Sequence, residues 1–125
     1  MTIELCGVSG FSEIGRNMTA VKVDGEVAIF DIGLHMENYI KLTEEEEEDV
    51  IGLSREQLIK AKAIPDDSII EDWKEHVKAI IPGHAHLDHV GAVPFLADHY
   101  RAPIFGTPYT IQVLKHILND SGIKL

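Results

Sequence analysis

The stretch that decides the fold is HAHLDH at positions 84–89, which places four potential metal ligands within six residues. It lies between an apolar run over residues 77–82 and a helical pattern over residues 90–100. The chain has 7 histidines, and chance assembly of this pattern from its composition has a probability on the order of 10⁻³. We therefore interpret the stretch as a metal site and not as a run of surface histidines.

The spacing within the motif suggests two metal ions. In an extended chain alternate residues share one side, so His84 and His86 can reach one ion while Leu87 faces the core. The chain then turns, which lets Asp88 and His89 address a second ion. Imidazole and carboxylate suit zinc and other first-row metals, and two such ions can clamp a displacement at phosphorus. We predict a site for two Zn²⁺ ions, with Asp88 and His89 also as catalytic residues.

The flanking sequence predicts an α/β fold. The first third indicates strands that are joined in part by a hairpin turn at Asp24-Gly25, and the last third alternates strand and helix, which is typical of a layered α/β domain. Ser54 and Gln57 resemble a capping box that opens a short helix in the middle third. The predicted strands cover residues 3–8, 18–23, 27–30, 77–82 and 102–106, and the predicted helices cover residues 54–63, 69–76, 90–100 and 108–119.

Composition narrows the class of protein. The 125 residues are 45% hydrophobic and include one cysteine, which indicates one globular domain without an internal disulfide, in a reducing compartment. The sequence contains no apolar run of membrane-spanning length and no visible signal peptide. A net charge of −10 argues against nucleic acid. That argument weakens because most of the excess lies in residues 35–78, including a run of six acids at 44–49 that we interpret as a solvated face.

Family resemblance adds to this interpretation. The motif at 84–89 resembles the HxHxDH signature of the metallo-β-lactamase superfamily, and IFDIG at 29–33 resembles the strand ending in aspartate that forms the family's first motif. The resemblance implies that Asp31 supports the metal loop without binding metal. EIGRNM at 13–18 and HVGAVPFL at 89–96 are similar to the RNA-processing β-CASP branch, and the stretch at 64–66 is most similar to archaeal-type ribonuclease J.

The resemblance covers essentially all 125 residues, but only the front of the family fold. It implies that residues 1–125 are the N-terminal part of a metallo-β-lactamase αββα sandwich. The rest of that domain and the β-CASP domain, with the further ligands and the general acid, would be the chain's missing C-terminal part. The whole enzyme would be cytoplasmic, would bind RNA and would not associate with a membrane. It would hydrolyse RNA with metal-bound hydroxide, 5′ to 3′ from a 5′ monophosphate. We expect this chain alone to be an incomplete, inactive site, and the resemblance leaves a homodimer of the whole enzyme open.

Two alternatives remain open from the sequence. One is an endoribonuclease of the cleavage and polyadenylation type, which shares these motifs. The other is a non-catalytic metal-binding fragment. Arg16 and Asn17 are compatible with the rim of the site or with a simple turn. The four other histidines are interpreted as surface or partly buried side chains, at positions 35, 76, 99 and 116.

Overall fold

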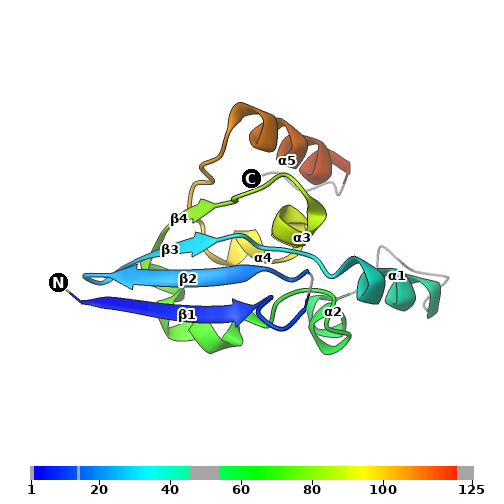
Figure 1. Ribbon diagram of the computed structural model, residues 1–125, viewed down its shortest axis with the longest axis horizontal. Helices are drawn as coiled ribbons and strands as arrows, with labels where there is room; N and C mark the ends of the chain where they lie inside the picture. The colour runs from blue at the N-terminus through cyan, green and yellow to red at the C-terminus, as the bar shows by residue number, and fades with distance from the viewer. Residues whose placement is uncertain (1, 14, 46–53, 121–125) are drawn as a thin grey trace.

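The computed structural model describes residues 2–13, 15–45 and 54–120. It confirms the predicted α/β class, with one four-stranded sheet in the order β1-β2-β3-β4 (Figure 1). The strands are β1 (Ile3–Ser9), β2 (Met18–Val23), β3 (Glu26–Phe30) and β4 (Val77–Ile81). The first three are antiparallel neighbours, and β4 pairs with β3 in parallel after a long crossover. The crossover brings the chain to the motif at 84–89 beside the end of β3.

Most of the helices are short, and the two longest α-helices cover residues 36–45 and 108–120. Those in the crossover are α1 (Met36–Glu45), α2 (Arg55–Lys60) and the 3-10 segment η2 (Asp67–His76), and those after β4 are α3 (Leu87–Val90), α4 (Val93–Leu96), η3 (Ala97–His99) and α5 (Pro108–Asp120). In Figure 1, α4 and η2 lie behind the sheet. Among the described helices, none is long and apolar enough to cross a membrane.

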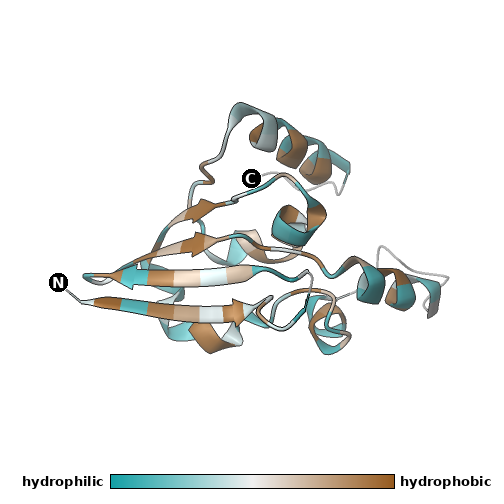
Figure 2. Ribbon diagram, viewed as in Figure 1, coloured by the Kyte–Doolittle hydropathy of each residue, from teal (hydrophilic) through white to brown (hydrophobic). Residues whose placement is uncertain are grey.

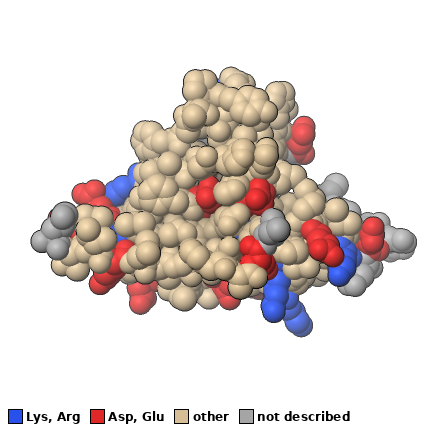
Figure 3. All heavy atoms as spheres, viewed as in Figure 1, with Lys and Arg blue, Asp and Glu red and all other residues tan. Residues whose placement is uncertain are grey.

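The core lies on one face of the sheet because side chains alternate along each strand. Val27 and Ile29 of β3 are fully buried, whereas Phe30 beside them is 39% exposed. On the opposite face Ile3 and Leu5 of β1 are exposed, and the brown segments along the strands in Figure 2 show how much of the sheet is hydrophobic. The side of the molecule seen in Figure 3 carries few charged atoms over the strands. The described residues therefore form a two-layer unit with one apolar sheet face uncovered.

Local signals in the sequence were borne out at the turns and caps. The Asp24-Gly25 hairpin joins β2 to β3, with both residues at positive φ. Ser54 and Gln57 form the predicted capping box of α2, although that helix ends at Lys60. The helix from Pro108 is confirmed as α5. The acidic positions 46–49 lie outside the described residues.

Two predicted elements were wrong. The continuous helix over 90–100 is broken into α3, α4 and η3, since the Ala92 N–H donates to the carbonyl of Ile32 at 3.0 Å instead of continuing α3. The strand over 102–106 is reduced to a single bridge between Ile104 and Ile80 of β4. The helix α1 was not predicted.

Candidate metal centre

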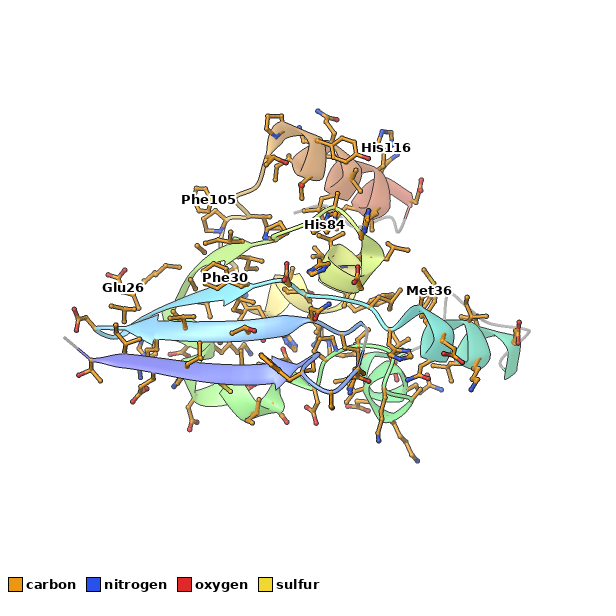
Figure 4. All side chains as sticks on the ribbon, in the orientation of Figure 1. Glu26, Phe30, Met36, His84, Phe105 and His116 are labelled. Carbon is orange, nitrogen blue, oxygen red and sulfur yellow. The ribbon has the colours of Figure 1, made fainter. Side chains whose placement is uncertain are left out.

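The motif begins in the turn after β4 and ends in α3, which contains Leu87, Asp88 and His89. His86 is the N-cap residue of α3, with extended backbone angles (φ −75°, ψ 153°), and His84 and His86 are both exposed. In Figure 4, His84 lies above the end of β3, between α3 and α5. Exposed imidazoles on a turn that the core holds in place can meet a metal and a substrate from solution.

The four candidate ligands form two pairs. The rings of His84 and His86 are stacked, with centroids 3.9 Å apart and an interplanar angle of 28°. Nε2 of His89 lies 3.5 Å from a carboxylate oxygen of Asp88. The pairs are neighbours, since the ring centroids of His84 and His89 are 5.4 Å apart. The turn thus brings all four side chains to one place, two by two.

The side chain of Asp31 contacts both Gly83, just before the motif, and His89, its last residue. It follows β3 at a φ of 67°, a left-handed conformation that Asp tolerates better than most residues. One carboxylate oxygen lies 3.0 Å from Nδ1 of His89, and the other accepts a hydrogen bond of 2.7 Å from the backbone N–H of Gly83. A carboxylate at Nδ1 holds the proton there and leaves Nε2 with a free lone pair for a metal. This geometry suits the supporting role that the resemblance implied.

Hydrogen bonds to backbone carbonyls of the motif hold it against the rest of the protein. Three consecutive carbonyls of the motif each accept a hydrogen bond from outside it. These bonds run from Leu34 N to Leu87 O (2.8 Å), from Asn17 Nδ2 to Asp88 O (2.8 Å) and from Ile32 N to His89 O (2.9 Å). Asn17, which the sequence left between a rim and a turn role, therefore contacts the motif directly. Spacing alone could not show this, because 71 residues separate the partners.

One orientation within the motif was predicted wrongly. Leu87 does not face the core but is 38% exposed. The chain has already turned into α3 at this residue, so the alternation of an extended strand no longer applies. Leu87 instead lines an open groove of about 830 Å³ together with His86, Asp88 and Val113. The groove gives the candidate ligands an apolar wall.

The candidate ligands are of types that zinc binds, but they are too few for a complete zinc site. Imidazole nitrogen and carboxylate oxygen are ordinary zinc ligands, and a zinc site has three or four of them. Within the part of the chain that the structure describes, no group of three or more His, Cys, Asp or Glu is placed to hold a metal ion. Each of the two pairs therefore supplies at most part of the ligands that a zinc ion needs.

The remaining histidines have structural surroundings. Nδ1 of His35 accepts a hydrogen bond of 3.1 Å from the Asn38 N–H in the first turn of α1. His76 and His116 are exposed. Nδ1 of His99 lies 3.2 Å from the carboxylate of buried Asp67. These positions agree with the interpretation from sequence.

Asp67 also anchors a polar cluster that the sequence did not predict. The hydroxyl of buried Tyr100 donates to the same Asp67 oxygen at 2.5 Å. Burial, followed by the hydrogen bond to Asp67, raises the pKa of Tyr100 far above its usual range. Arg55 contacts His99 and donates to the carbonyl of Phe95 at 2.8 Å. The cluster connects the crossover segment to the helices that follow the motif.

Comparison with known proteins gives the relatives of this chain. It is 45% identical over 115 residues to ribonuclease J of Methanocaldococcus jannaschii, and 44% identical over 114 residues to ribonuclease J of Pyrococcus abyssi. These alignments cover 92% and 90% of this chain. The chain is similar to ribonuclease J over most of its own length. It spans about a quarter of the length of these curated relatives, 25% and 24%. No family model matches the chain.

Solved structures show weaker likenesses. The short form of human tRNase Z has a TM-score of 0.49 and 16% identity, covering 98% of this chain and 41% of its own. A diphosphatase of the PhnP family has a TM-score of 0.42 and 22% identity, covering 85% of this chain and 34% of its own. The similarity to ribonuclease J therefore rests on the sequence alignments.

Proposed function

We propose that this chain is the N-terminal part of a cytoplasmic, zinc-dependent ribonuclease that degrades RNA 5′ to 3′ from a 5′-monophosphate end. The observation that carries the proposal is the intact motif at 84–89, supported by Asp31, in a chain similar to ribonuclease J. A nuclease also suits the chemistry of the donors, because divalent metal offsets the charge of a phosphodiester.

In this proposal the two donor pairs would each hold part of one Zn²⁺ ion. When bound, the ions would supply electrostatic stabilisation at phosphorus and an activated water. Asp31, 3.0 Å from Nδ1 of His89, would hold the ring proton at Nδ1, so that Nε2 would be available on the side of Asp88. The three hydrogen bonds to the carbonyls of Leu87, Asp88 and His89 would keep Asp88 and His89 in fixed positions without a bound metal.

The missing ligands and the general acid would come from the rest of a longer polypeptide. The curated relatives are about four times the length of the matched region, and each donor pair here lacks at least one further ligand. The chain alone would then be inactive on RNA. The same length leaves room for the β-CASP domain and for contacts that form a homodimer.

A chimera tests the proposal. The matched segment of Methanocaldococcus jannaschii ribonuclease J is replaced by this chain, and end-labelled RNA with a 5′ monophosphate or a 5′ triphosphate is the substrate. We expect stepwise degradation of the monophosphate RNA. It should be abolished by Asp88→Ala and by chelation, and unaffected by His116→Ala, which removes an exposed histidine outside the motif.

The products distinguish the alternatives. Internal cleavage that is indifferent to the 5′ end would favour the endoribonuclease. A chimera that binds zinc but leaves both RNAs intact, under conditions where the natural enzyme works, would favour the non-catalytic metal-binding fragment.

A further inference from the structure

The structure assigns a positioning role to Asn17: its carboxamide fixes the turn that carries Asp88 and His89. The inference deepens the proposed function, on which its metal-binding consequence rests. Its contacts, however, are present in the protein without any metal. The hydrogen bonds of Asn17 go to backbone atoms of Asp88 and Gly33, so we infer that its effect on the ligands passes through the backbone.

Asn17 makes three hydrogen bonds, two of them to the carbonyl of Asp88. Its side-chain amide donates to that carbonyl at 2.8 Å, and its backbone N–H approaches the same oxygen at 3.3 Å. Its own carbonyl accepts from Gly33 N at 2.9 Å. One residue at the start of β2 is thereby joined to the metal motif and to the segment after β3.

The backbone approaches Asn17 closely at two glycines. A Cβ atom added at Gly10 would lie 2.6 Å from its side-chain oxygen and 2.8 Å from its Cα. A Cβ added at Gly33 would lie 1.8 Å from the Asp88 carbonyl oxygen and 2.7 Å from the Asn17 nitrogen. Two glycines thus let the backbone close around Asn17 on both sides. Such enclosure is what a side chain needs to hold another group within a fraction of an ångström.

The Asp88 carbonyl needs an outside donor because α3 is only four residues long. The last carbonyls of a helix have no partner within it, and the N–H of Ala92, which would continue the ladder to Asp88, donates to Ile32 instead. Asn17 supplies the missing donor. Without the carboxamide this oxygen keeps only the 3.3 Å bond from the Asn17 backbone N–H, so the Asp88 carbonyl is held less tightly and the 3.5 Å approach of the Asp88 and His89 side chains is less firmly fixed.

The test compares Asn17→Ala and Asn17→Asp with a matched control, Asn38→Ala. Asn38 also donates its side-chain amide to a backbone carbonyl, that of Lys62 at 3.0 Å, away from the motif. Two quantities are measured on the 125-residue chain. One is affinity for Co²⁺ from its visible absorption, with Zn²⁺ in competition. The other is the hydrogen-exchange rate of the Ile32 and Leu34 amides, which bond to motif carbonyls.

We expect both Asn17 variants to bind metal about tenfold more weakly and to exchange these two amides at least tenfold faster. The Asn38 variant should match the natural chain in both. If the natural 125-residue chain binds no metal, the exchange rates alone decide the positioning role, and the proposed function is judged separately from the chimera, which supplies the further ligands.

Unchanged exchange in both Asn17 variants would overturn the inference, whatever the metal affinity. Loss of the cooperative fold in both variants would overturn it as well, since Asn17 would then be required by the whole fold and not by the turn.

Discussion

Replacing Gly33 by alanine should destabilise the protein strongly, although Gly33 has an ordinary backbone conformation. Its φ is not in the left-handed region, so the cost does not come from backbone strain. It comes from space, because the new Cβ would lie 1.8 Å from the Asp88 carbonyl oxygen and 2.5 Å from the carbonyl carbon. Both atoms are backbone and cannot rotate out of the way.

The size of the effect follows from the shift that this contact demands. Carbon and oxygen normally approach to about 3.3 Å, so the two segments must separate by roughly 1.5 Å. That separation breaks the hydrogen bonds to Leu87, Asp88 and His89, each contributing about 1 kcal/mol, and adds the usual cost of overpacking. We expect the free energy of unfolding to fall by about 4–6 kcal/mol, a large share of the stability of a small domain.

Urea unfolding followed by circular dichroism measures the loss, with Gly83→Ala as the matched control. Gly83 also adjoins the motif, and a Cβ there would meet only Asp31 oxygens at 3.6 and 3.9 Å, an ordinary contact. We expect the control to change stability by less than about 1 kcal/mol. A Gly33→Ala variant as stable as the control would refute the close contact between the segment after β3 and the motif.

Two further predictions concern side chains. Asp31→Asn should weaken Zn²⁺ binding 10–100-fold, since a carboxamide no longer fixes the proton of His89 at Nδ1; calorimetric titration measures this, with exposed Asp66→Asn as control. Tyr100→Phe should cost about 1.5–3 kcal/mol at pH 7 by removing a donor to a buried carboxylate, whereas Tyr109→Phe, at a 72% exposed residue, should be neutral. Burial raises the Tyr100 pKa above its ordinary 10.0, so the hydroxyl stabilises the fold fully below pH 10 and less above it. Urea unfolding between pH 8 and 11 should therefore show the natural chain losing its advantage over Tyr100→Phe, and a constant difference would contradict the buried hydrogen bond.

Local signals predicted much of this fold because they act over a few residues. A hairpin at Asp24-Gly25 needs only two residues that accept positive φ. The cap of α2 needs Ser54 and Gln57, three positions apart. The strand positions followed from runs of apolar side chains, which all four observed strands contain. The four donors of the motif could be found for the same reason, since they are neighbours in the chain.

Long-range contacts account for what could not be predicted. The break after α3 depends on Ile32, which is 60 positions before Ala92, the residue whose N–H it accepts. No periodicity near residue 92 indicates that partner. Leu87 is exposed because α3 already begins at this residue. The cluster around Asp67 joins segments more than 30 residues apart. Helix α1 is different, because Met36, Tyr39 and Ile40 recur at helical spacing; a local signal for this helix was present and was not used.

The contacts of the motif indicate that its conformation does not depend on a bound metal ion. In a small zinc-binding domain the ion itself often provides the folding energy, so the protein unfolds without it. Here the turn is held by Asp31 and by three backbone carbonyl bonds that belong to the core. Each donor pair, by contrast, offers too few ligands to bind an ion tightly alone. The affinity for metal would therefore depend mainly on ligands supplied from elsewhere, while the geometry presented to them is already set by this chain.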